Sequence, residues 1–386
     1  AAEQRRARYV ETAARIVRIY APTVHILAAV TFLFWFFFGG AAWSTALLYA
    51  VAVLIVTCPC ALALAVPVVQ VVAANRLFRR GVLVKSPTAL ERLATVDTIV
   101  LDKTGTVTLG QPELNEGENW SRADLEAAAA LAATSLHQLA RAVAAAAPDV
   151  PAADGVREEP GYGLALETPD GEIRLGRGGW AGGAPSESAA LELWFSRPGK
   201  AVVRFGMTDT LRPDAAETIR AFVDLGFAVE MLSGDRASAV APVAETLGIV
   251  RWRADCSPAE KIARLEALIA EGRHPCMIGD GLNDAPALAA ATASISPATA
   301  ADISQTAADV VFQGEKLDSV FETIRVARMA NRLVRQNFGL AFSYNVITVP
   351  IAMAGLVTPL IAAVAMSTSS LIVIGNALRL GWRGRS

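Results

Sequence analysis

The stretch Thr98-Ile-Val-Leu-Asp-Lys-Thr-Gly-Thr106 places Asp102 directly after residues that are typical of a buried strand. Gly105 follows closely, so the chain can turn sharply and present backbone N–H groups to an anion beside the carboxylate. In open parallel sheets, ligands bind beyond the carboxyl ends of the strands. We therefore expect Asp102 to lie at a phosphate-binding edge of a sheet.

Two later segments, Ala228–Leu232 and Pro275–Ile278, also have the pattern of short strands that end at glycine-rich or aspartate-bearing turns. Segments with helical periodicity, for example Pro213–Leu225, separate the strands. This alternation of strands and helices is typical of a doubly wound parallel sheet. The sequence thus predicts an α/β domain formed by residues 81–110 and 205–330.

Residues 111–204 interrupt this domain and follow a different pattern. They are rich in alanine, glycine and glutamate. Strand-like pieces, around turns such as Pro169-Asp170-Gly171, occur at Leu164–Thr168, Glu172–Leu175 and Ala201–Phe205. We expect an inserted α+β domain with antiparallel strands.

Three segments after Asp102 complete a possible phosphoryl-transfer site. They are Ser233-Gly234-Asp235, Lys261, and the loop from Gly279 through Asp280 to Asp284. Asp102 would attack the phosphate, Lys261 and the Ser233 hydroxyl would hold its oxygens, and the paired carboxylates suit Mg²⁺, which prefers oxygen ligands. Taken singly, such turns are usually only turns. Their order, each near a strand end, favours catalysis.

The stretch Asp102–Thr106, together with Gly279–Asp284 and the following Ala-Pro-Ala-Leu, resembles the signature pair of P-type ATPases, members of the haloacid-dehalogenase-like superfamily. The resemblance covers essentially the whole chain. It implies a haloacid-dehalogenase-like phosphorylation domain in which ATP forms an aspartyl phosphate at Asp102, beside Lys103. It also implies that Mg²⁺ binds the carbonyl of Thr104 and the carboxylates of Asp102, Asp280 and Asp284.

Two further segments bear on this resemblance. Asp209-Thr210-Leu211-Arg212-Pro213 resembles the segment at the hinge where the chain returns from the inserted domain. Ser233 stands where the family usually has threonine. The hydroxyl is kept, so we expect little loss of activity.

The inserted segment, residues 111–204, is expected to be the nucleotide-binding domain. In the heavy-metal subclass of these ATPases, a His-Pro pair and a Gly-x-Gly pair line the adenine pocket. His137 matches the first pair, and Gly161 and Gly163 match the second, where glycines let the backbone approach the nucleotide. Gln138 replaces the expected proline, so the resemblance implies weakened rather than abolished ATP binding.

The chain is 53% hydrophobic, and the excess is concentrated in four stretches. Each is close to the ~20 residues that cross a bilayer as a helix. They run roughly from Pro22 to Phe38, Thr45 to Ala74, Phe338 to Leu356 and Thr358 to Leu378. They form two pairs, within residues 1–80 and 331–386, and arginines crowd the ends away from the short links. The positive-inside rule places both termini and the middle region in the cytoplasm, and we expect an integral protein of the bacterial plasma membrane.

The segment Cys58-Pro59-Cys60 lies within the second apolar stretch. Residues two apart on a regular helix point about 200° away from each other, so the thiols converge only if Pro59 unwinds the turn. Two thiolates prefer soft ions, Cu(I) first and Zn(II) as competitor. The plainer alternative is a pair of buried, inert cysteines beside a kink.

The last two apolar stretches contain no Asp, Glu, Lys, Arg or His between Phe338 and Leu378. A hard divalent ion would call for carboxylates. This region instead offers hydroxyl, amide and thioether groups, at Tyr344, Asn345, Met366 and Ser369. These features favour Cu(I) or Ag(I) and resemble the copper-transporting P-type ATPases. Ala61–Pro67 and the His-Gln pair resemble the pumps that serve cytochrome oxidase assembly.

The net charge of −2 gives no argument for nucleic-acid binding, and we expect none. The resemblance implies an actuator domain with Thr-Gly-Glu, which does not occur in this sequence. We therefore expect the actuator domain and earlier helices to belong to the remainder of the same pump, and a copper chaperone to deliver the metal. On this interpretation the chain is a part that forms the phosphoenzyme without completing a transport cycle.

Three alternatives stay open at this point. A zinc- or cadmium-exporting P-type ATPase is the nearest, although those members carry a lysine and an aspartate in the last spans. A membrane-tethered phosphatase of the same superfamily would need an acidic residue where Thr104 stands. A non-catalytic copper-binding membrane module would use only the cysteines.

Overall fold

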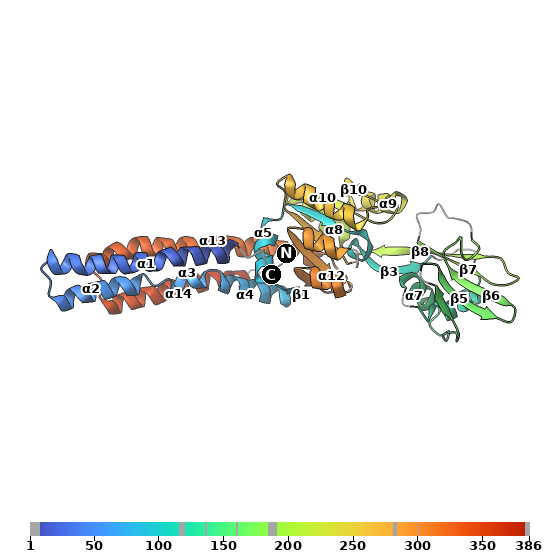
Figure 1. Ribbon diagram of the computed structural model, residues 1–386, viewed down its shortest axis with the longest axis horizontal. Coiled ribbons are helices and arrows are strands. Elements are labelled where there is room, and N and C mark those ends of the chain that lie inside the picture. Colours follow the sequence, from blue (N-terminus) through green and yellow to red (C-terminus); the bar gives the residue numbers. More distant parts are fainter. Residues whose placement is uncertain are drawn as a thin grey trace. The chain divides into compact units, whose positions relative to one another are not determined.

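The protein is described by a computed structural model over residues 8–115, 120–135, 137–159, 161–183, 191–280, 284–300 and 302–382. The chain divides into two compact units. The helical unit comprises residues 1–96, 309–312 and 319–386, and the sheet unit comprises residues 97–308 and 313–318. Figure 1 shows the long helices of the first and the two sheets of the second.

The helical unit is built of helices, most of them long, that lie side by side (Figure 1). In chain order they are α1 (Arg8–Phe37), α2 (Trp43–Val56), α3 (Cys60–Leu64), α4 (Pro67–Phe78), α13 (Asp318–Met353) and α14 (Pro359–Trp382). Small side chains let the helices approach closely, as in the buried cluster of Ala28, Ala50, Val53 and Ala352. Large apolar side chains such as Phe37 and Leu360 are exposed, which suits outer faces that contact lipid.

Among the described residues, two helical segments are long and apolar enough to cross a membrane. They are residues 43–78, which include the break between α2 and α3, and residues 359–381 in α14. The apolar part of α1, Pro22–Phe37, is shorter. The third predicted stretch lies in the second half of α13. Two of the four predicted crossings thus meet the requirement of length and composition, and the other two stay predictions.

The helix that contains Cys58 is broken, as predicted. α2 ends at Val56 and α3 begins at Cys60. The amide of Cys58 donates to the carbonyl of Ile55 at 3.2 Å, a three-residue spacing that is common where a helix ends. Pro59 has no N–H to continue the ladder, which explains the break.

A short antiparallel pair belongs to the same unit. It joins β1 (Val82–Val84) to β13 (Val310–Phe312), and α5 (Pro87–Thr95) follows β1.

The buried carboxylate of Glu322 on α13 lies 2.7 Å from the guanidinium of Arg76 on α4. Arg76 also donates to the carbonyl of Leu380 at 2.8 Å. This one arginine therefore ties α4 to both α13 and α14.

The sheet unit contains a parallel sheet whose strands follow one another in the order β12-β11-β2-β9-β10. The strands are β2 (Thr98–Leu101), β9 (Ala228–Leu232), β10 (Arg251–Arg253), β11 (Pro275–Ile278) and β12 (Ala293–Pro297). The helices that alternate with them are α8 (Ala215–Asp224), α9 (Ala237–Leu247), α10 (Pro258–Ala270), α11 (Ala285–Ala290) and α12 (Asp302–Ala307). Every residue of β2 and β11 is buried, as in sheets covered on both faces. The predicted parallel α/β sheet is confirmed.

A second, antiparallel sheet has the order β3-β8-β7-β6-β5-β4. Its strands are β3 (Thr108–Leu114), β4 (Arg157–Glu159), β5 (Gly163–Thr168), β6 (Gly171–Gly176), β7 (Leu191–Ser196) and β8 (Val203–Leu211). The helices α6 (Arg122–Ala132) and α7 (Gln138–Ala145) pack on it around Phe195 and Phe205. The chain leaves the parallel sheet through β3 and returns through β8 (Figure 1). The antiparallel strands expected in the insertion are confirmed.

Candidate functional site

Asp102 lies at the carboxyl end of β2, buried, with its amide bonded to the carbonyl of Ile278 at 2.9 Å. The ammonium group of Lys261 lies 2.6 Å from Asp102 Oδ1 and 2.7 Å from Asp284 Oδ1. Ser257 caps α10 and presents Lys261 in its first turn, through a capping box with Glu260. Three residues that the sequence singled out separately therefore meet at one point.

Asp102, Asp280 and Asp284 offer carboxylate oxygens that lie within 4.8 Å of one another. Burial, and next the carboxylate of Asp284, raise the pKa of Asp102 to about 7, although Lys261 opposes the rise. Burial and Asp284 likewise raise the pKa of Asp280 to about 7. Burial alone would lower the pKa of Lys261, but the charges of Asp102 and Asp284 outweigh it and raise that pKa.

Lys261 contacts two of these three carboxylates, Asp102 and Asp284, and the three gathered carboxylates together fit a divalent cation. Oxygen donors are the ligands that Mg²⁺ prefers. The residues present therefore fit the predicted Mg²⁺ site. Gly281, Leu282 and Asn283 of the same loop lie outside the described residues.

The turn after Asp102 contains Gly105, whose φ is +67°. The Thr108 hydroxyl accepts a hydrogen bond from the amide of Gly105 at 3.0 Å. A Cβ atom at position 105 would lie 1.4 Å from Asp280 Oδ2. The sequence analysis explained Gly105 by the sharp turn. The structure adds a stronger reason for a glycine here, because the Asp280 carboxylate occupies the space that a side chain at position 105 would need.

Asp235 does not join the carboxylate cluster. Its carboxylate lies 2.7 Å from the ammonium group of Lys103 and accepts a hydrogen bond from the Thr104 hydroxyl at 3.2 Å. Ser233, at the end of β9, is buried and accepts a hydrogen bond from the amide of Asp235 at 3.1 Å. Asp235 thus holds the turn that follows Asp102. In its bond to Asp235 the Ser233 hydroxyl is the acceptor, so its own proton can be donated to another group.

Arg212 is a residue of this site that the sequence reasoning did not select. It is buried, and its guanidinium donates to the carbonyls of Thr106 at 2.7 Å, Gly105 at 3.0 Å and Gly314 at 3.0 Å. Arg212 therefore fixes the backbone of the turn that follows Asp102. The resemblance of Asp209–Pro213 to a hinge segment was the signal that pointed to it.

A cavity of about 690 Å³ contains the predicted nucleotide residues. Its lining includes His137, Gly161 and Gly163 from the antiparallel sheet and its helices, and Lys103 and Asp235 from the turns near Asp102. The residues expected to bind the nucleotide and the turn that follows Asp102 therefore line one cavity. Leu136 and Pro160, beside these residues, lie outside the described part of the chain.

Two of the residues expected to bind the nucleotide, His137 and Gly163, also have local structural roles. His137 caps α7, since its Nδ1 accepts the amide of Leu139 at 3.3 Å. Gly163 pairs with Gly176 across β5 and β6, and a Cβ at Gly163 would lie 2.3 Å from the carbonyl oxygen of Leu175. Gly163, the second glycine of the Gly-x-Gly pair, is thus needed because the neighbouring strand approaches closely, a reason that the sequence did not reveal.

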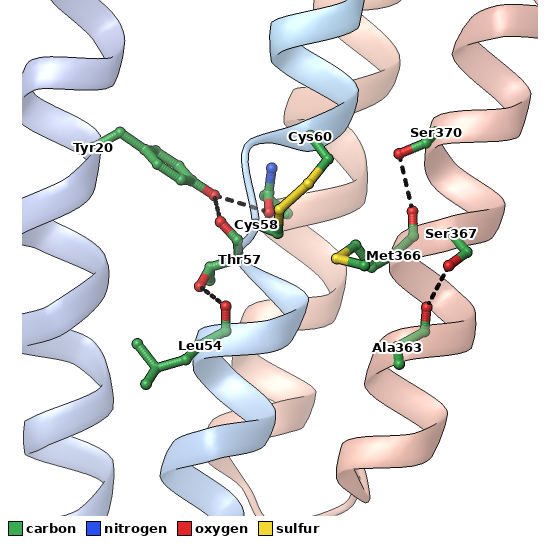
Figure 2. The surroundings of a disulfide bond; sticks show 10 residues. Tyr20, Leu54, Thr57, Cys58, Cys60, Ala363, Met366, Ser367 and Ser370 are labelled. Atoms are coloured by element: carbon green, nitrogen blue, oxygen red, sulfur yellow. Dashed lines mark hydrogen bonds between the residues drawn. A yellow bond between two sulfur atoms is a disulfide. The ribbon is translucent and has the colours of Figure 1, made fainter.

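In the helical unit, Cys58 and Cys60 converge as predicted, but their state differs from the prediction. The structure joins them in a disulfide bond, whereas two free thiolates were expected (Figure 2). The broken turn lets the two sulfur atoms meet, and thiols that meet can be oxidised to a disulfide. Only the reduced pair offers thiolates to a metal ion.

A second cavity, also of about 690 Å³, lies beside Cys58. Its polar lining comes from Tyr20, Tyr344 and Asn345, and the rest is mainly apolar. The predicted residues Cys58, Tyr344 and Asn345 therefore share one cavity. Tyr20 on α1 was not selected from the sequence, because no motif marks it.

Met366 and Ser369 lie on α14 and are not among the residues that line this cavity. Figure 2 shows the Met366 side chain extending from α14 toward Cys58. Ser369 is buried, and the Ser370 hydroxyl donates to the carbonyl of Met366 at 3.3 Å. The Met366 thioether is thus directed toward the cysteine pair from α14.

Known proteins are similar to this chain over a part of it or over its whole length. Residues 96–292 match the family described as haloacid dehalogenase-like hydrolase. The chain is 50% identical to nitrogen fixation protein FixI of Rhizobium leguminosarum bv. viciae, over 100% of this chain and 51% of that protein. It is 32% identical to a copper-exporting P-type ATPase of Mycobacterium leprae, over 98% of this chain and 50% of the relative. The chain thus spans about half the length of these curated relatives.

A solved structure supports the same likeness. The crystal structure of a zinc-transporting PIB-type ATPase in the E2.Pi state matches with a TM-score of 0.75 and 29% identity. The match covers 98% of this chain and 65% of that one.

Proposed function

Since the chain belongs to the haloacid dehalogenase-like hydrolase family and its homologues are heavy-metal P-type ATPases, we propose that it is part of an ATP-driven membrane pump for a soft metal ion, Cu(I). The observation that carries the proposal is the buried contact of Lys261 with both Asp102 and Asp284, next to Asp280. A nucleophilic carboxylate, a fixed cation and further carboxylates suited to Mg²⁺ are what phosphoryl transfer to an aspartate requires.

In the proposed reaction, a carboxylate oxygen of Asp102 forms a bond to the γ-phosphorus of ATP. The bond to the bridging oxygen breaks, and ADP leaves with its electron pair. Lys261 favours the ionised form of Asp102 that attacks, and Lys261 with the Ser233 hydroxyl would hold the phosphoryl oxygens. Mg²⁺, held by the three carboxylates and the Thr104 carbonyl, would supply charge neutralisation on the phosphate.

ATP would bind in the cavity that His137, Gly161 and Gly163 line. Lys103 and Asp235 line the same cavity, so a nucleotide held there can extend its phosphates toward the turn after Asp102. Gln138 is the first residue of α7, where proline would be well tolerated. The absence of proline at this position is expected to weaken the capping turn at His137 without removing the binding surface.

The transported ion would bind the reduced Cys58 and Cys60, with Tyr344, Asn345, Met366 and Ser369 around them. Two thiolates and a thioether, without a carboxylate in α14 or the apolar half of α13, favour Cu(I) or Ag(I) over hard ions. The copper-exporting relative supports this choice, although it is identical at only 32% of positions.

The proposal includes four membrane crossings, with both termini and the sheet unit on the cytoplasmic side of a bacterial plasma membrane. The exposed apolar faces of α1 and α14 support membrane contact. The further partners that we propose are the rest of the pump, including its actuator domain, and a chaperone that delivers the metal.

Zinc is the rival ion, and the likeness to a zinc-transporting PIB-type ATPase favours it. A phosphatase of the same superfamily fits less well. It would need an acid at position 104, where the Thr104 hydroxyl instead bonds to Asp235.

The test is the metal dependence of phosphorylation. The reduced chain in lipid nanodiscs is incubated with Mg²⁺ and ATP labelled at the γ-phosphate, with either Cu(I) or Zn(II) added. We expect Cu(I) to change the amount of aspartyl phosphate, and Cys58→Ser to remove that response. A response to Zn(II) alone would transfer the proposal to zinc, and a metal response that survives Cys58→Ser would contradict the proposed metal path.

A further inference from the structure

Tyr20 joins three separate elements of the helical unit. It lies on α1, and its hydroxyl is 2.8 Å from the carbonyl oxygen of Thr57 and 3.2 Å from Asn345 Oδ1. Thr57 is in the break between α2 and α3, and Asn345 is on α13. Figure 2 shows the ring of Tyr20 directed at Thr57, the residue before Cys58.

The Thr57 carbonyl needs a donor because of the break. In a continuous helix it would accept the amide of the residue four positions later, but α2 ends at Val56 and α3 begins only at Cys60. Thr57 is buried, so water cannot easily replace that donor. The Tyr20 hydroxyl takes this place, which stabilises the unwound turn on which the cysteines converge.

The same hydroxyl fixes the orientation of Asn345. Asn345 Nδ2 donates to the carbonyl of Ala341 at 2.9 Å, while Oδ1 faces the Tyr20 hydroxyl. The one hydroxyl proton of Tyr20, shared between the Thr57 carbonyl and Asn345 Oδ1, and the Ala341 carbonyl thus orient the amide at its two ends. Tyr20 and Asn345 also line the cavity beside Cys58, so the oriented amide borders the proposed metal site.

We propose that Tyr20 is a positioning residue for the transported ion, acting through the Thr57 carbonyl and the Asn345 amide. The inference rests on the proposed function, because it assumes an ion at Cys58 and Cys60. It predicts that loss of one hydroxyl on α1 weakens metal binding without disturbing the phosphorylation site.

The test compares Tyr20→Phe with Tyr49→Phe in the reduced chain in lipid nanodiscs. Tyr49 lies on α2 and packs its ring on Trp35 at 5.1 Å, so its variant removes a hydroxyl from another part of the helical unit. The Cu(I) dissociation constant is measured by competition with a chromophoric chelator. Tyr20→Phe removes the one O–H donor that the Thr57 carbonyl and Asn345 Oδ1 share. Loss of this buried hydrogen bond predicts about tenfold weaker Cu(I) binding in Tyr20→Phe and no change in Tyr49→Phe.

A second measurement separates positioning from damage to the fold. The Cu(I) concentration that gives half of the full metal response of Asp102 phosphorylation should rise by the same factor in Tyr20→Phe, while the full response stays unchanged. In the double variant that combines Tyr20→Phe with Asn345→Ala, the Cu(I) dissociation constant should rise by less than the product of the two single-variant factors. The reason is that both substitutions act on one amide.

Unchanged Cu(I) affinity in Tyr20→Phe would overturn the inference, and so would a loss of the full metal response or full additivity with Asn345→Ala. These outcomes leave the proposed function intact, provided that the unsubstituted chain binds Cu(I) and Cys58→Ser does not. An unsubstituted chain that binds no ion at the cysteines removes the proposed function and the role of Tyr20 together.

Discussion

At the scale of single residues, Gly105 tolerates a side chain least among the residues of the turn that follows Asp102. Its φ is +67°, and a Cβ atom there would overlap the carboxylate of Asp280 at 1.4 Å. Gly105→Ala should therefore displace a proposed Mg²⁺ ligand as well as strain the backbone. We expect the amount of aspartyl phosphate formed from labelled ATP to fall by at least about tenfold.

Gly226 provides the matched control for this substitution. It also has a positive φ, +80°, but a Cβ there would meet no atom within 4 Å. Gly226→Ala should keep its labelling, because only backbone strain is added. Equal labelling in the two variants would show that the approach of Asp280 to the turn does not matter.

The carboxylate cluster predicts a pH dependence that can be measured without any substitution. The pKa values of Asp102 and Asp280 are both raised to about 7. Below that pH the carboxyl groups hold protons and are neutral, so protons compete with Mg²⁺ for the same oxygens. The Mg²⁺ concentration needed for half-maximal labelling should therefore rise as the pH falls from about 8 to about 6.

Asp280→Asn tests the origin of that dependence, because an amide cannot take up the proton. The variant should need more Mg²⁺ at every pH, and its requirement should change less steeply with pH. A Mg²⁺ requirement that is constant across this range in the unsubstituted chain would contradict the assignment of the cluster.

At the scale of elements, the capped start of α10 places Lys261 against Asp102. Ser257→Ala removes the capping box with Glu260, which should cost about 1 kcal/mol of helix stability. Hydrogen exchange in the first turn of α10 should then accelerate about fivefold. Because that turn carries Lys261, formation of the aspartyl phosphate should also slow severalfold.

The helix α6 supplies a matched comparison, since Ser121 and Asp124 form the same kind of capping box there. Ser121→Ala should accelerate exchange in α6 by a similar factor and leave the rate of phosphorylation unchanged. If the two substitutions slowed phosphorylation equally, the cap of α10 would have only a general effect on stability.

Local patterns were enough to predict the elements around Asp102. A four-residue apolar strand followed by a polar turn is a short-range signal, and it predicted the parallel sheet. The expectation that Asp102, Lys261 and Asp284 form one site rested on the order of the segments and on the resemblance to P-type ATPases, and the structure brings the three residues together. The break at Pro59 was predictable for the same reason, because the missing N–H of proline acts within one turn.

Contacts between distant segments were not predictable in this way. Tyr20 reaches Asn345 across 325 positions, and Arg212 reaches Thr106 across 106 positions, without a pattern that links the partners. The need for Gly163 follows from its pairing with Gly176, which only the register of β5 and β6 reveals. The disulfide between Cys58 and Cys60 depends on their oxidation state, which a sequence does not specify.

At the scale of the whole molecule, the chain combines two kinds of chemistry in two compact units. The sheet unit carries the buried carboxylates with Lys261, and a cavity that we propose binds the nucleotide. The helical unit carries a sulfur pair at a broken helix, with Arg76 tying α4 to α13 and α14. On the proposed function, both kinds of chemistry belong to one ATP-driven metal pump, like the heavy-metal P-type ATPases to which the chain is similar.

The central claim is that Asp102 accepts the γ-phosphate of ATP, and one measurement tests it directly. The chain is incubated with Mg²⁺ and γ-labelled ATP and is then denatured in acid. The account predicts a label that survives acid, is released by hydroxylamine as expected for an acyl phosphate, and is absent from Asp102→Asn. A label that persists in Asp102→Asn, or an unsubstituted chain that takes up none, would contradict it.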